Sequence, residues 1–308
     1  MIVLILEPAD FPQGALDALA QLGEVMVGEV PADRRGEVEV VFTRLARRLD
    51  ATFHTEYPAL RFIVSPTTGL DHLDLDHFAR AGVQVISLRG ETAFLDSIHA
   101  TAEFTIALAL ALLRDLPGAT RAVGSGAWNR YPHKGRELHG KSVLLLGYGR
   151  IGRLVRPLYE AFGCRVRAYD RDPAKVPRDI ACDLDAALGE TDVLSVHVSF
   201  DDSTRGLIGD AMLERLSPQA VVINTSRGDI VDQAALLDRI EDGRLAGAAL
   251  DVLSGEPAPL DEALSERIAR LGRRLIVTPH IGGYTEESLD AVELFVTQRL
   301  CEAIDAGR

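Results

Sequence analysis

The sequence VLLLGYGRIG at residues 143–152 places three glycines directly after a run of aliphatic residues. The aliphatic run predicts a buried strand, and residues 154–162 favour a helix. Because the glycines have G-x-G-x-x-G spacing, the first permits a tight turn, the second lets the backbone approach a pyrophosphate, and the third allows close helix–strand packing. The helix amino terminus would present free N–H groups to that anion. We therefore expect a dinucleotide to be bound by Gly147, Gly149, Arg150, Ile151 and Gly152.

An acidic residue at the end of the next predicted strand indicates which dinucleotide is bound. Asp170 follows the strand predicted at residues 165–169. A carboxylate there can accept hydrogen bonds from both ribose hydroxyls and would repel a 2′-phosphate, which favours NAD over NADP. Arg171 comes next, and a guanidinium can pair with that phosphate, so NADP stays the less favoured alternative.

Short β-branched runs alternate with helix-like stretches along the chain, as is typical of parallel sheets covered by helices. The first series of runs occupies residues 2–6, 25–27, 38–42, 61–64 and 83–86. The second series occupies residues 142–146, 165–169, 193–196, 220–223, 246–250 and 275–277. The two series predict an α/β protein with two doubly wound parallel-sheet domains, a Rossmann nucleotide domain and a flavodoxin-like substrate domain.

The stretches between and after these series set the expected domain bounds. An apolar helix is predicted at residues 96–114, a loop-rich arm at 121–139 and a closing helix at 285–304. We expect the substrate domain to comprise residues 1–97 and 285–308, and the dinucleotide-binding domain to comprise residues 98–284.

Composition and charge exclude several classes of partner. The 46 acidic and 33 basic residues give a formal net charge of −13, which argues against a nucleic-acid surface and against a polybasic membrane patch. The longest apolar run, residues 104–113, is too short to cross a bilayer. The three cysteines are far apart and predict reduced thiols, so we expect a cytoplasmic protein. Residues 71–77, DHLDLDH, match no known metal-ligand spacing, and no metal is expected.

Three polar residues follow strands of the second series, at the edge where an α/β fold places its ligand crevice. They are Arg227, Glu256 and His280. Nicotinamide-dependent oxidation of a hydroxy acid needs a cation for the carboxylate and a group that moves the hydroxyl proton. Each residue alone has an ordinary alternative: a surface ion pair for the arginine, a solvated imidazole for the histidine, or turn chemistry before Pro257 for the glutamate. Their placement on successive strand ends favours a site.

Four ordered motifs resemble those of the D-isomer-specific 2-hydroxyacid dehydrogenases. They are GYGRIG at 147–152, NTSRG at 224–228, Asp251-Val252 with GEP at 255–257, and TPHIGG at 278–283. The resemblance covers almost the whole chain, because TGLDHLD at 68–74 and ATAE at 100–103 also look like family segments. It implies that Arg227 clamps the substrate carboxylate and polarises the carbonyl, that His280 gives or takes the proton, and that Glu256 pairs with the imidazolium.

The same resemblance implies further contacts. Asp251 would hold the nicotinamide carboxamide, Thr101 a phosphate, and Thr225 and Ser226 would line the nicotinamide. His197 would lie beside the adenine, where Ser199 replaces the usual family proline. The substrate carboxylate would meet backbone N–H groups of the segment Thr68, Gly69 and Leu70, with Arg44 at the rim. The family also implies a homodimer.

Two other functions fit the same fold. One is an NAD-sensing scaffold of the corepressor kind, and the other is a formate- or phosphite-type dehydrogenase. Retention of all three groups argues against the scaffold, and Glu256 together with His280 fits proton-coupled chemistry on a 2-hydroxy or 2-oxo acid better than formate or phosphite oxidation.

Overall fold

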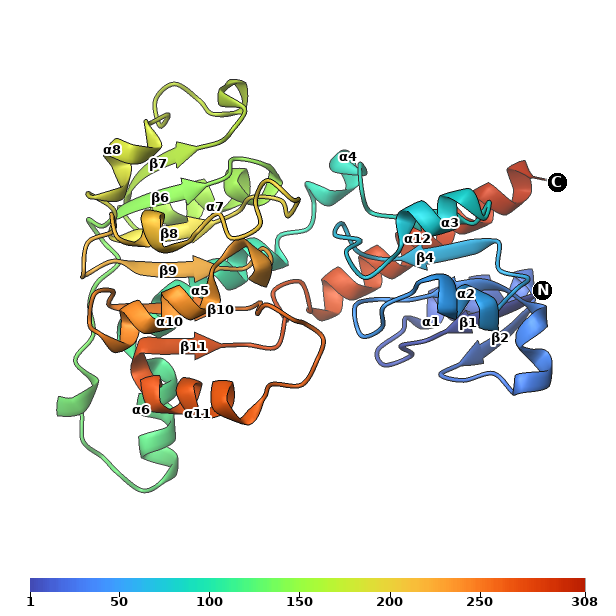
Figure 1. Cartoon of the computed structure of the whole chain (residues 1–308), viewed down its shortest axis with the longest axis horizontal. Helices are drawn as coiled ribbons and strands as arrows, with labels where there is room; N and C mark the ends of the chain where they lie inside the picture. Colours follow the sequence, from blue (N-terminus) through green and yellow to red (C-terminus); the bar gives the residue numbers. More distant parts are fainter. Residues whose placement is uncertain (308) are drawn as a thin grey trace. The chain divides into compact units, whose positions relative to one another are not determined.

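A computed structural model describes residues 1–307, and the backbone falls into two compact units. Unit 1 comprises Met1–Ile98 and Tyr284–Arg308, and unit 2 comprises His99–Gly283. Each unit holds one parallel sheet with helices packed against it (Figure 1). The predicted α/β class with two parallel sheets is confirmed.

Unit 1 contains five strands in the order β2-β1-β3-β4-β5, which is the flavodoxin-like order. The strands are β1 (Ile2–Ile5), β2 (Glu24–Val27), β3 (Val38–Phe42), β4 (Phe62–Ser65) and β5 (Gln84–Ser87). The helices are α1 (Gln13–Leu22), η1 (Ala32–Glu37), α2 (Ala51–Glu56), α3 (Leu75–Arg80), α4 (Thr92–Leu95) and α12 (Glu286–Ala306).

Unit 2 contains six strands in the order β11-β10-β9-β8-β6-β7. The strands are β6 (Ser142–Leu146), β7 (Arg165–Tyr169), β8 (Val193–Val196), β9 (Val221–Asn224), β10 (Gly247–Leu250) and β11 (Leu275–Val277). The helices are α5 (Ala100–Arg114), α6 (Leu116–Gly124), α7 (Arg150–Ala161), α8 (Leu184–Leu188), α9 (Asp210–Leu213), α10 (Gln233–Glu241) and α11 (Glu262–Leu271), with single 3₁₀ turns at η2 (Tyr131–His133), η3 (Pro173–Lys175), η4 (Gly228–Ile230) and η5 (Gly272–Arg274).

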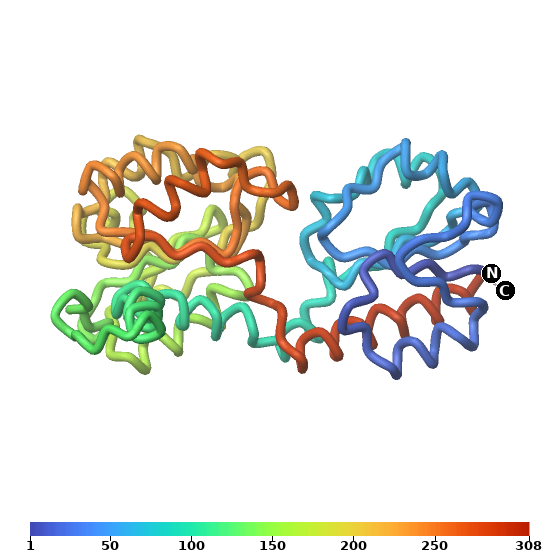
Figure 2. The backbone as a smooth tube through the Cα atoms, turned by 90° about the horizontal axis from the view of Figure 1, so that it is seen from below, coloured from blue at the N-terminus to red at the C-terminus, as the bar shows by residue number. Residues whose placement is uncertain are grey.

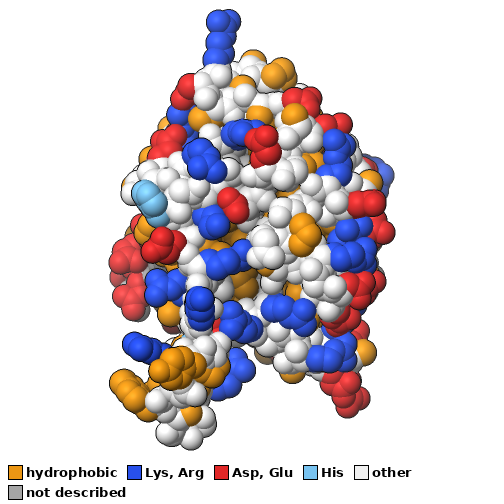
Figure 3. Space-filling view, turned by 90° about the vertical axis from the view of Figure 1, so that its left-hand side faces the viewer, with side chains coloured by type: hydrophobic (Ala, Val, Ile, Leu, Met, Phe, Trp, Pro, Cys, Tyr) orange, Lys and Arg blue, Asp and Glu red, His pale blue; other side chains and the backbone are white. Residues whose placement is uncertain are grey.

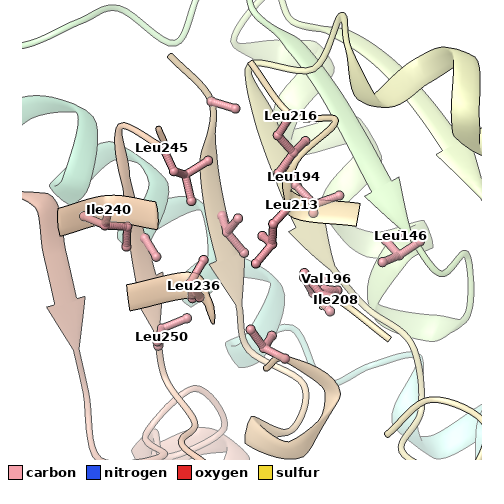
Figure 4. Close-up of a cluster of buried hydrophobic side chains, with 14 of the residues drawn as sticks. Leu146, Leu194, Val196, Ile208, Leu213, Leu216, Leu236, Ile240, Leu245 and Leu250 are labelled. Atoms are coloured by element: carbon pink, nitrogen blue, oxygen red, sulfur yellow. The ribbon is translucent and has the colours of Figure 1, made fainter. Parts of the chain in front are cut away.

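Both faces of the unit 2 sheet are buried, because successive strand side chains point to opposite faces. Leu144 and Leu146 join the apolar cluster under α9, α10 and α11, part of which is drawn in Figure 4. Val143 and Leu145 join the cluster under α5 and α7. Figure 2 shows these two helix layers, green on one side of the sheet and orange on the other.

The strand order indicates where each unit would bind a ligand. In an open parallel sheet, ligands bind beyond the carboxyl ends of the strands where the order reverses. That point lies between β6 and β8 in unit 2 and between β1 and β3 in unit 1. The glycine turn follows β6, and Arg44 follows β3.

Some predicted elements differ from the structure. The helix predicted at 96–114 begins only at Ala100, because α4 and a short break precede it. The predicted arm at 121–139 is helical as far as Gly124, since Asp115 adopts a left-handed backbone (φ 52°) that ends α5 and begins α6. Within residues 1–307, no helix is long and apolar enough to cross a membrane.

Candidate active site

The glycine turn after β6 tolerates no side chain at two of its positions. Gly147 has φ +97°, and a Cβ there would lie 2.6 Å from the carbonyl carbon of His197. A Cβ at Gly152 would lie 2.4 Å from the carbonyl oxygen of Gly147. Gly149 is the N-cap residue of α7 and faces open space. The turn therefore leads into a helix amino terminus with open space at Gly149, and a helix amino terminus of this kind fits a pyrophosphate.

Asp170 is joined directly to this turn. Its Oδ2 accepts a hydrogen bond from the Tyr148 backbone N–H at 2.8 Å, and its Oδ1 accepts one from the Asp172 N–H at 2.9 Å. The neighbouring guanidinium of Arg171 is paired with Asp201 at 2.9 Å. The Asp170 carboxylate is thus held beside the glycine turn, while the charge of Arg171 is paired with Asp201.

The side chain of His197 lies inside unit 2. Its Nε2 is 2.8 Å from the Ser195 hydroxyl, and its Nδ1 is buried without a hydrogen-bond partner. Burial lowers the pKa of His197 to about 3, so the imidazole is neutral. The backbone of His197 lies against the glycine turn.

Glu256 and His280 form a hydrogen-bonded pair. The Nδ1 of His280 is 2.6 Å from Oε2 of Glu256, and both side chains are partly exposed. The other carboxylate oxygen, Oε1, accepts a hydrogen bond from the Leu253 N–H. With Nδ1–H donating to the carboxylate, Nε2 is the nitrogen left for a substrate.

The backbone at His280 is strained. Its φ is +56°, a left-handed conformation that non-glycine residues rarely adopt. The His280 N–H donates to the carbonyls of Asp251 at 2.8 Å and Thr278 at 3.0 Å, which hold the residue in place. Such strain persists only where the surroundings impose it, and it is concentrated at functional sites.

Asp251 supplies much of that restraint. Its buried carboxylate accepts hydrogen bonds from the Thr278 hydroxyl at 2.7 Å, the Ile281 N–H at 2.9 Å and the Gly282 N–H at 2.7 Å. Burial raises the pKa of Asp251, and these hydrogen bonds oppose the rise. The carboxylate therefore shapes the turn that carries His280.

Arg227 stands at the end of β9, and its loop is packed against the loop of Glu256. The side chain of Asn224 fixes the local turn: it donates to the Arg227 carbonyl at 2.9 Å and accepts from the Ser226 N–H at 2.9 Å. A Cβ at Gly228 would lie 1.9 Å from the carbonyl carbon of Leu253, so the two loops are in backbone contact. β9, β10 and β11 are neighbours, which brings the loops of all three candidate catalytic residues to adjacent strand ends.

The remaining predicted cofactor contacts lie around α5 and β9. The Thr225 hydroxyl is 2.9 Å from that of Thr105, which also donates to the Thr101 carbonyl at 2.8 Å. Ser226 donates its hydroxyl proton to the Val196 carbonyl at 2.8 Å. Thr101 is close to the glycine pair after His280, since a Cβ at Gly283 would lie 3.8 Å from the Thr101 hydroxyl.

In unit 1 the predicted substrate residues follow β3 and β4. The Arg44 guanidinium donates to Glu293 at 2.8 Å and to the Ala9 carbonyl at 2.8 Å, so two of its nitrogens are occupied within the unit. Thr68 is exposed, Gly69 is half-buried and Leu70 is buried.

Sequence reasoning gave no role to Asn224, Thr278 or Gly228, although all three shape the site. The one signal for Asn224 is that an asparagine directly follows a predicted buried strand, because asparagine side chains often fix such turns. The contact of Gly228 involves residues 25 positions further along the chain (253 − 228 = 25) and left no local signal. No group of three or more His, Cys, Asp or Glu side chains among residues 1–307 could hold a metal ion.

Comparison with known proteins gives one family for this arrangement. Residues 106–282 match the family described as "D-isomer specific 2-hydroxyacid dehydrogenase, NAD binding domain". The hydroxypyruvate reductase of Thermotoga maritima is 32% identical over 267 residues, covering 86% of this chain and 84% of that protein. The D-3-phosphoglycerate dehydrogenase of Mycobacterium bovis is 35% identical over 260 residues, covering 82% of this chain, which spans only 47% of that relative's length.

Solved structures resemble the chain over its full length. A crystal structure of D-lactate dehydrogenase from Aquifex aeolicus, complexed with NAD and lactic acid, has a TM-score of 0.83 and 25% sequence identity, covering 99% of this chain and 96% of that one. The likeness therefore covers the residues of both units.

Proposed function

The chain belongs to the D-isomer-specific 2-hydroxyacid dehydrogenase family, and from this premise we propose that it is an oxidoreductase transferring a hydride between NAD(H) and a small 2-hydroxy or 2-oxo acid. The observation that carries the proposal is the 2.6 Å pair of Glu256 and His280. The loop of Glu256 follows β10, the strand beside the one that Arg227 follows, and His280 lies on a strained turn after β11. Acid–base catalysis needs a proton-transfer group held by an orienting partner, and this pair supplies both.

In the proposed reduction each of the three residues has one task. Bound NADH supplies the hydride for C2 of the 2-oxo acid. Arg227 pairs with the substrate carboxylate through its planar guanidinium and polarises the carbonyl. His280 gives a proton from Nε2 to the carbonyl oxygen, so that the C=O becomes a C–OH as the hydride arrives. Glu256 stabilises the imidazolium before the transfer and fixes the ring orientation. Oxidation of the 2-hydroxy acid runs through the same steps in reverse.

Other residues complete the proposed site. Backbone N–H groups of Gly69 and Leu70, with Thr68 beside them, would bind the substrate carboxylate from unit 1, and Arg44 would lie at the rim. In unit 2, Thr101, Thr225 and Ser226 would line the cofactor. The Asp251 carboxylate shapes the histidine turn through its three hydrogen bonds. The same carboxylate would make the contact with the nicotinamide carboxamide that the resemblance implies. We assign the dinucleotide to unit 2 and the substrate segments to unit 1, in a cytoplasmic enzyme.

The direct test of this function is turnover. NADH oxidation would be followed at 340 nm with glyoxylate, hydroxypyruvate, pyruvate and bulkier 2-oxo acids, with formate and phosphite tested in the oxidative direction. We expect NADH loss with at least one small 2-oxo acid. NADH binding without turnover of any substrate would contradict the proposal and favour a dinucleotide-sensing scaffold.

Cofactor preference is expected to depend on the charge of Asp170. In Asp170→Asn the amide oxygen can still accept from the Tyr148 N–H, but the hydrogen bond from the Asp172 N–H and the negative charge that repels a 2′-phosphate are lost. We expect the ratio of kcat/KM for NADPH to that for NADH to rise about tenfold, the effect of roughly one charge-assisted hydrogen bond. Glu266→Gln removes the charge of an exposed acid on α11 and serves as the control. An unchanged ratio in Asp170→Asn would remove Asp170 from cofactor selection.

A homodimer is proposed, with an interface on the loop after α6. Trp128 is 91% exposed and Tyr131 is 81% exposed, far more than aromatic side chains usually are in a monomer. Figure 3 shows exposed hydrophobic side chains gathered at one end of a face of the molecule, beside Lys and Arg side chains.

The two aromatic residues provide the test of the dimer. Wild-type protein is expected to have the mass of a dimer by light scattering, and the double variant Trp128→Ser, Tyr131→Ser is expected to dissociate at micromolar concentration. Leu294→Ser, at a 44% exposed position on α12, should leave the mass unchanged. If the double variant keeps the mass of a dimer, the interface does not lie on this loop.

A further inference from the structure

The segment after β4 is held at both ends by backbone hydrogen bonds. The Thr67 carbonyl accepts from the Leu88 N–H at 3.1 Å, and the His72 carbonyl accepts from the Leu49 N–H at 2.8 Å. Between these points lie Gly69 and Leu70, whose N–H groups are assigned to the substrate carboxylate above. These two hydrogen bonds fix the ends of the segment. They do not fix the orientation of the peptide group between Gly69 and Leu70, which other groups must hold.

The side chains of His72, Ser65 and Thr67 form a series of hydrogen bonds, here called the relay, that ends at this peptide group. The Nε2 of His72 is 3.4 Å from the Ser65 hydroxyl, which is 2.9 Å from the Thr67 hydroxyl. The Thr67 hydroxyl donates to the Gly69 carbonyl at 2.8 Å. Ser65 is fully buried and His72 is 8% exposed, so bulk water has little access to these two members of the relay.

The number of protons available determines which group donates and which accepts in each hydrogen bond of the relay. Thr67 has one hydroxyl proton, and it goes to the Gly69 carbonyl. The hydroxyl of Thr67 must therefore accept from Ser65, which uses the only proton of Ser65. Ser65 can then only accept from His72, so Nε2 of His72 carries a proton. The relay runs one way, from imidazole N–H through two hydroxyls to one carbonyl.

The Gly69 carbonyl and the Leu70 N–H belong to the same planar peptide group. We propose that His72, Ser65 and Thr67 are positioning residues that fix this peptide plane and direct the Leu70 N–H toward the substrate carboxylate, an assignment that rests on the function proposed above. Hydrogen bonds donated in series polarise one another, so the relay also strengthens the N–H as a donor. No residue of the relay touches the reacting atoms.

The chain offers a spectroscopic test of the relay that does not depend on catalysis. Leucine follows glycine at only two places, Gly69–Leu70 and Gly206–Leu207. Protein labelled with ¹³C-carbonyl glycine and ¹⁵N-leucine therefore gives two carbonyl-to-amide correlations in an HNCO spectrum. In Thr67→Val, which is nearly isosteric, the Gly69–Leu70 signal is expected to move to lower carbonyl frequency because the hydroxyl donor is lost. Thr67→Ser keeps the donor and should stay near wild type, and the Gly206–Leu207 signal is the internal control.

The second part of the test is kinetic. Because the Leu70 N–H would bind ground state and transition state alike, Thr67→Val should raise KM for the 2-oxo acid about tenfold, with kcat and the Kd for NADH nearly unchanged. Thr67→Ser should restore the wild-type KM. His72→Leu should raise KM in the same direction by a smaller factor, and His72→Gln, whose amide can donate, should recover part of it.

The outcomes separate this proposal from the function on which it rests. An unmoved Gly69–Leu70 signal in Thr67→Val, or equal displacement in Thr67→Ser, would overturn the relay whatever the enzyme does. A moved signal with unchanged KM would overturn the link to the substrate. Wild-type protein that turns over no 2-oxo acid, with the signal moving as expected, would contradict the proposed function and leave the relay supported.

Discussion

Replacing His280 by alanine is expected to lower kcat for 2-oxo acid reduction by at least ~10²-fold, because the group that gives a proton to the carbonyl oxygen is removed. The Kd for NADH should change little, since the imidazole is paired with Glu256 and not with the glycine turn. Steady-state kinetics at 340 nm and an NADH fluorescence titration would measure the two quantities.

Two further variants make this prediction specific. His139→Ala removes an exposed histidine of unit 2 that has no part in the site and should keep wild-type kcat. Glu256→Gln leaves two donors, the Leu253 N–H and Nδ1–H of His280, facing a single amide oxygen, so it should lower kcat in the same direction. Wild-type kcat in His280→Ala with a verified substrate would exclude His280 from the mechanism.

Gly228→Ala is expected to damage the site as severely without removing any polar group. The new Cβ would lie 1.9 Å from the Leu253 carbonyl carbon and 2.2 Å from its oxygen, and both are rigid backbone atoms. The loops of Arg227 and Glu256 would have to separate, and a displacement of about 1 Å can cost 10²-fold in rate. We expect kcat/KM to fall by at least ~10²-fold and Tm to fall as well.

The matched control is Gly124→Ala, which adds the same methyl group in unit 2 where no heavy atom lies within 4 Å. It should leave both kcat/KM and Tm near wild type. Full activity in Gly228→Ala would show that the two loops do not need their backbone contact, and would contradict the account of how Arg227 and Glu256 are held.

The elements next to the glycine turn could be predicted well from sequence because their signals are local. The strand predicted at 142–146 and the strand at 165–169 have the bounds of β6 and β7. The helix after the turn was predicted from residue 154, but α7 begins at Arg150. Gly149 is the N-cap residue of α7, and Gly152 lies in its first turn. Because glycine has a low helix propensity, the sequence does not indicate that a helix begins here. The close contact between Gly152 and Gly147 explains why glycine is present at that position.

The arm was harder to predict because its structure depends on distant contacts. Asp115 ends α5 in a left-handed conformation, and its carboxylate is 2.7 Å from Nδ1 of His133, 18 residues further on (133 − 115 = 18). A Cβ at Gly118 would lie 2.3 Å from the Asp115 carboxylate, so a larger residue there would displace the side chain that contacts His133. Nothing in the local pattern around residue 121 indicates that a helix begins five residues earlier.

For the site, the sequence predicted which residue types stand at strand ends, but not which atoms meet. The pairing of Glu256 with His280 came from family resemblance, since spacing alone cannot join a loop after β10 to one after β11. The residues that hold the pair, such as Asp251 with its three hydrogen bonds, depend on the folded geometry of the histidine turn. The partner of Arg44 was likewise not predictable, because its guanidinium donates to Glu293, 249 residues further along the chain.

The convergence of Arg227, Glu256 and His280 on one substrate is tested most directly by a crystal structure with NADH and oxamate, an unreactive analogue of a 2-oxo acid. We predict that the oxamate carboxylate pairs with the guanidinium of Arg227, and that Nε2 of His280 lies about 3 Å from the oxygen that stands for the substrate carbonyl. Oxamate bound away from both side chains, or in contact with Arg227 while His280 faces solvent, would contradict the proposed mechanism.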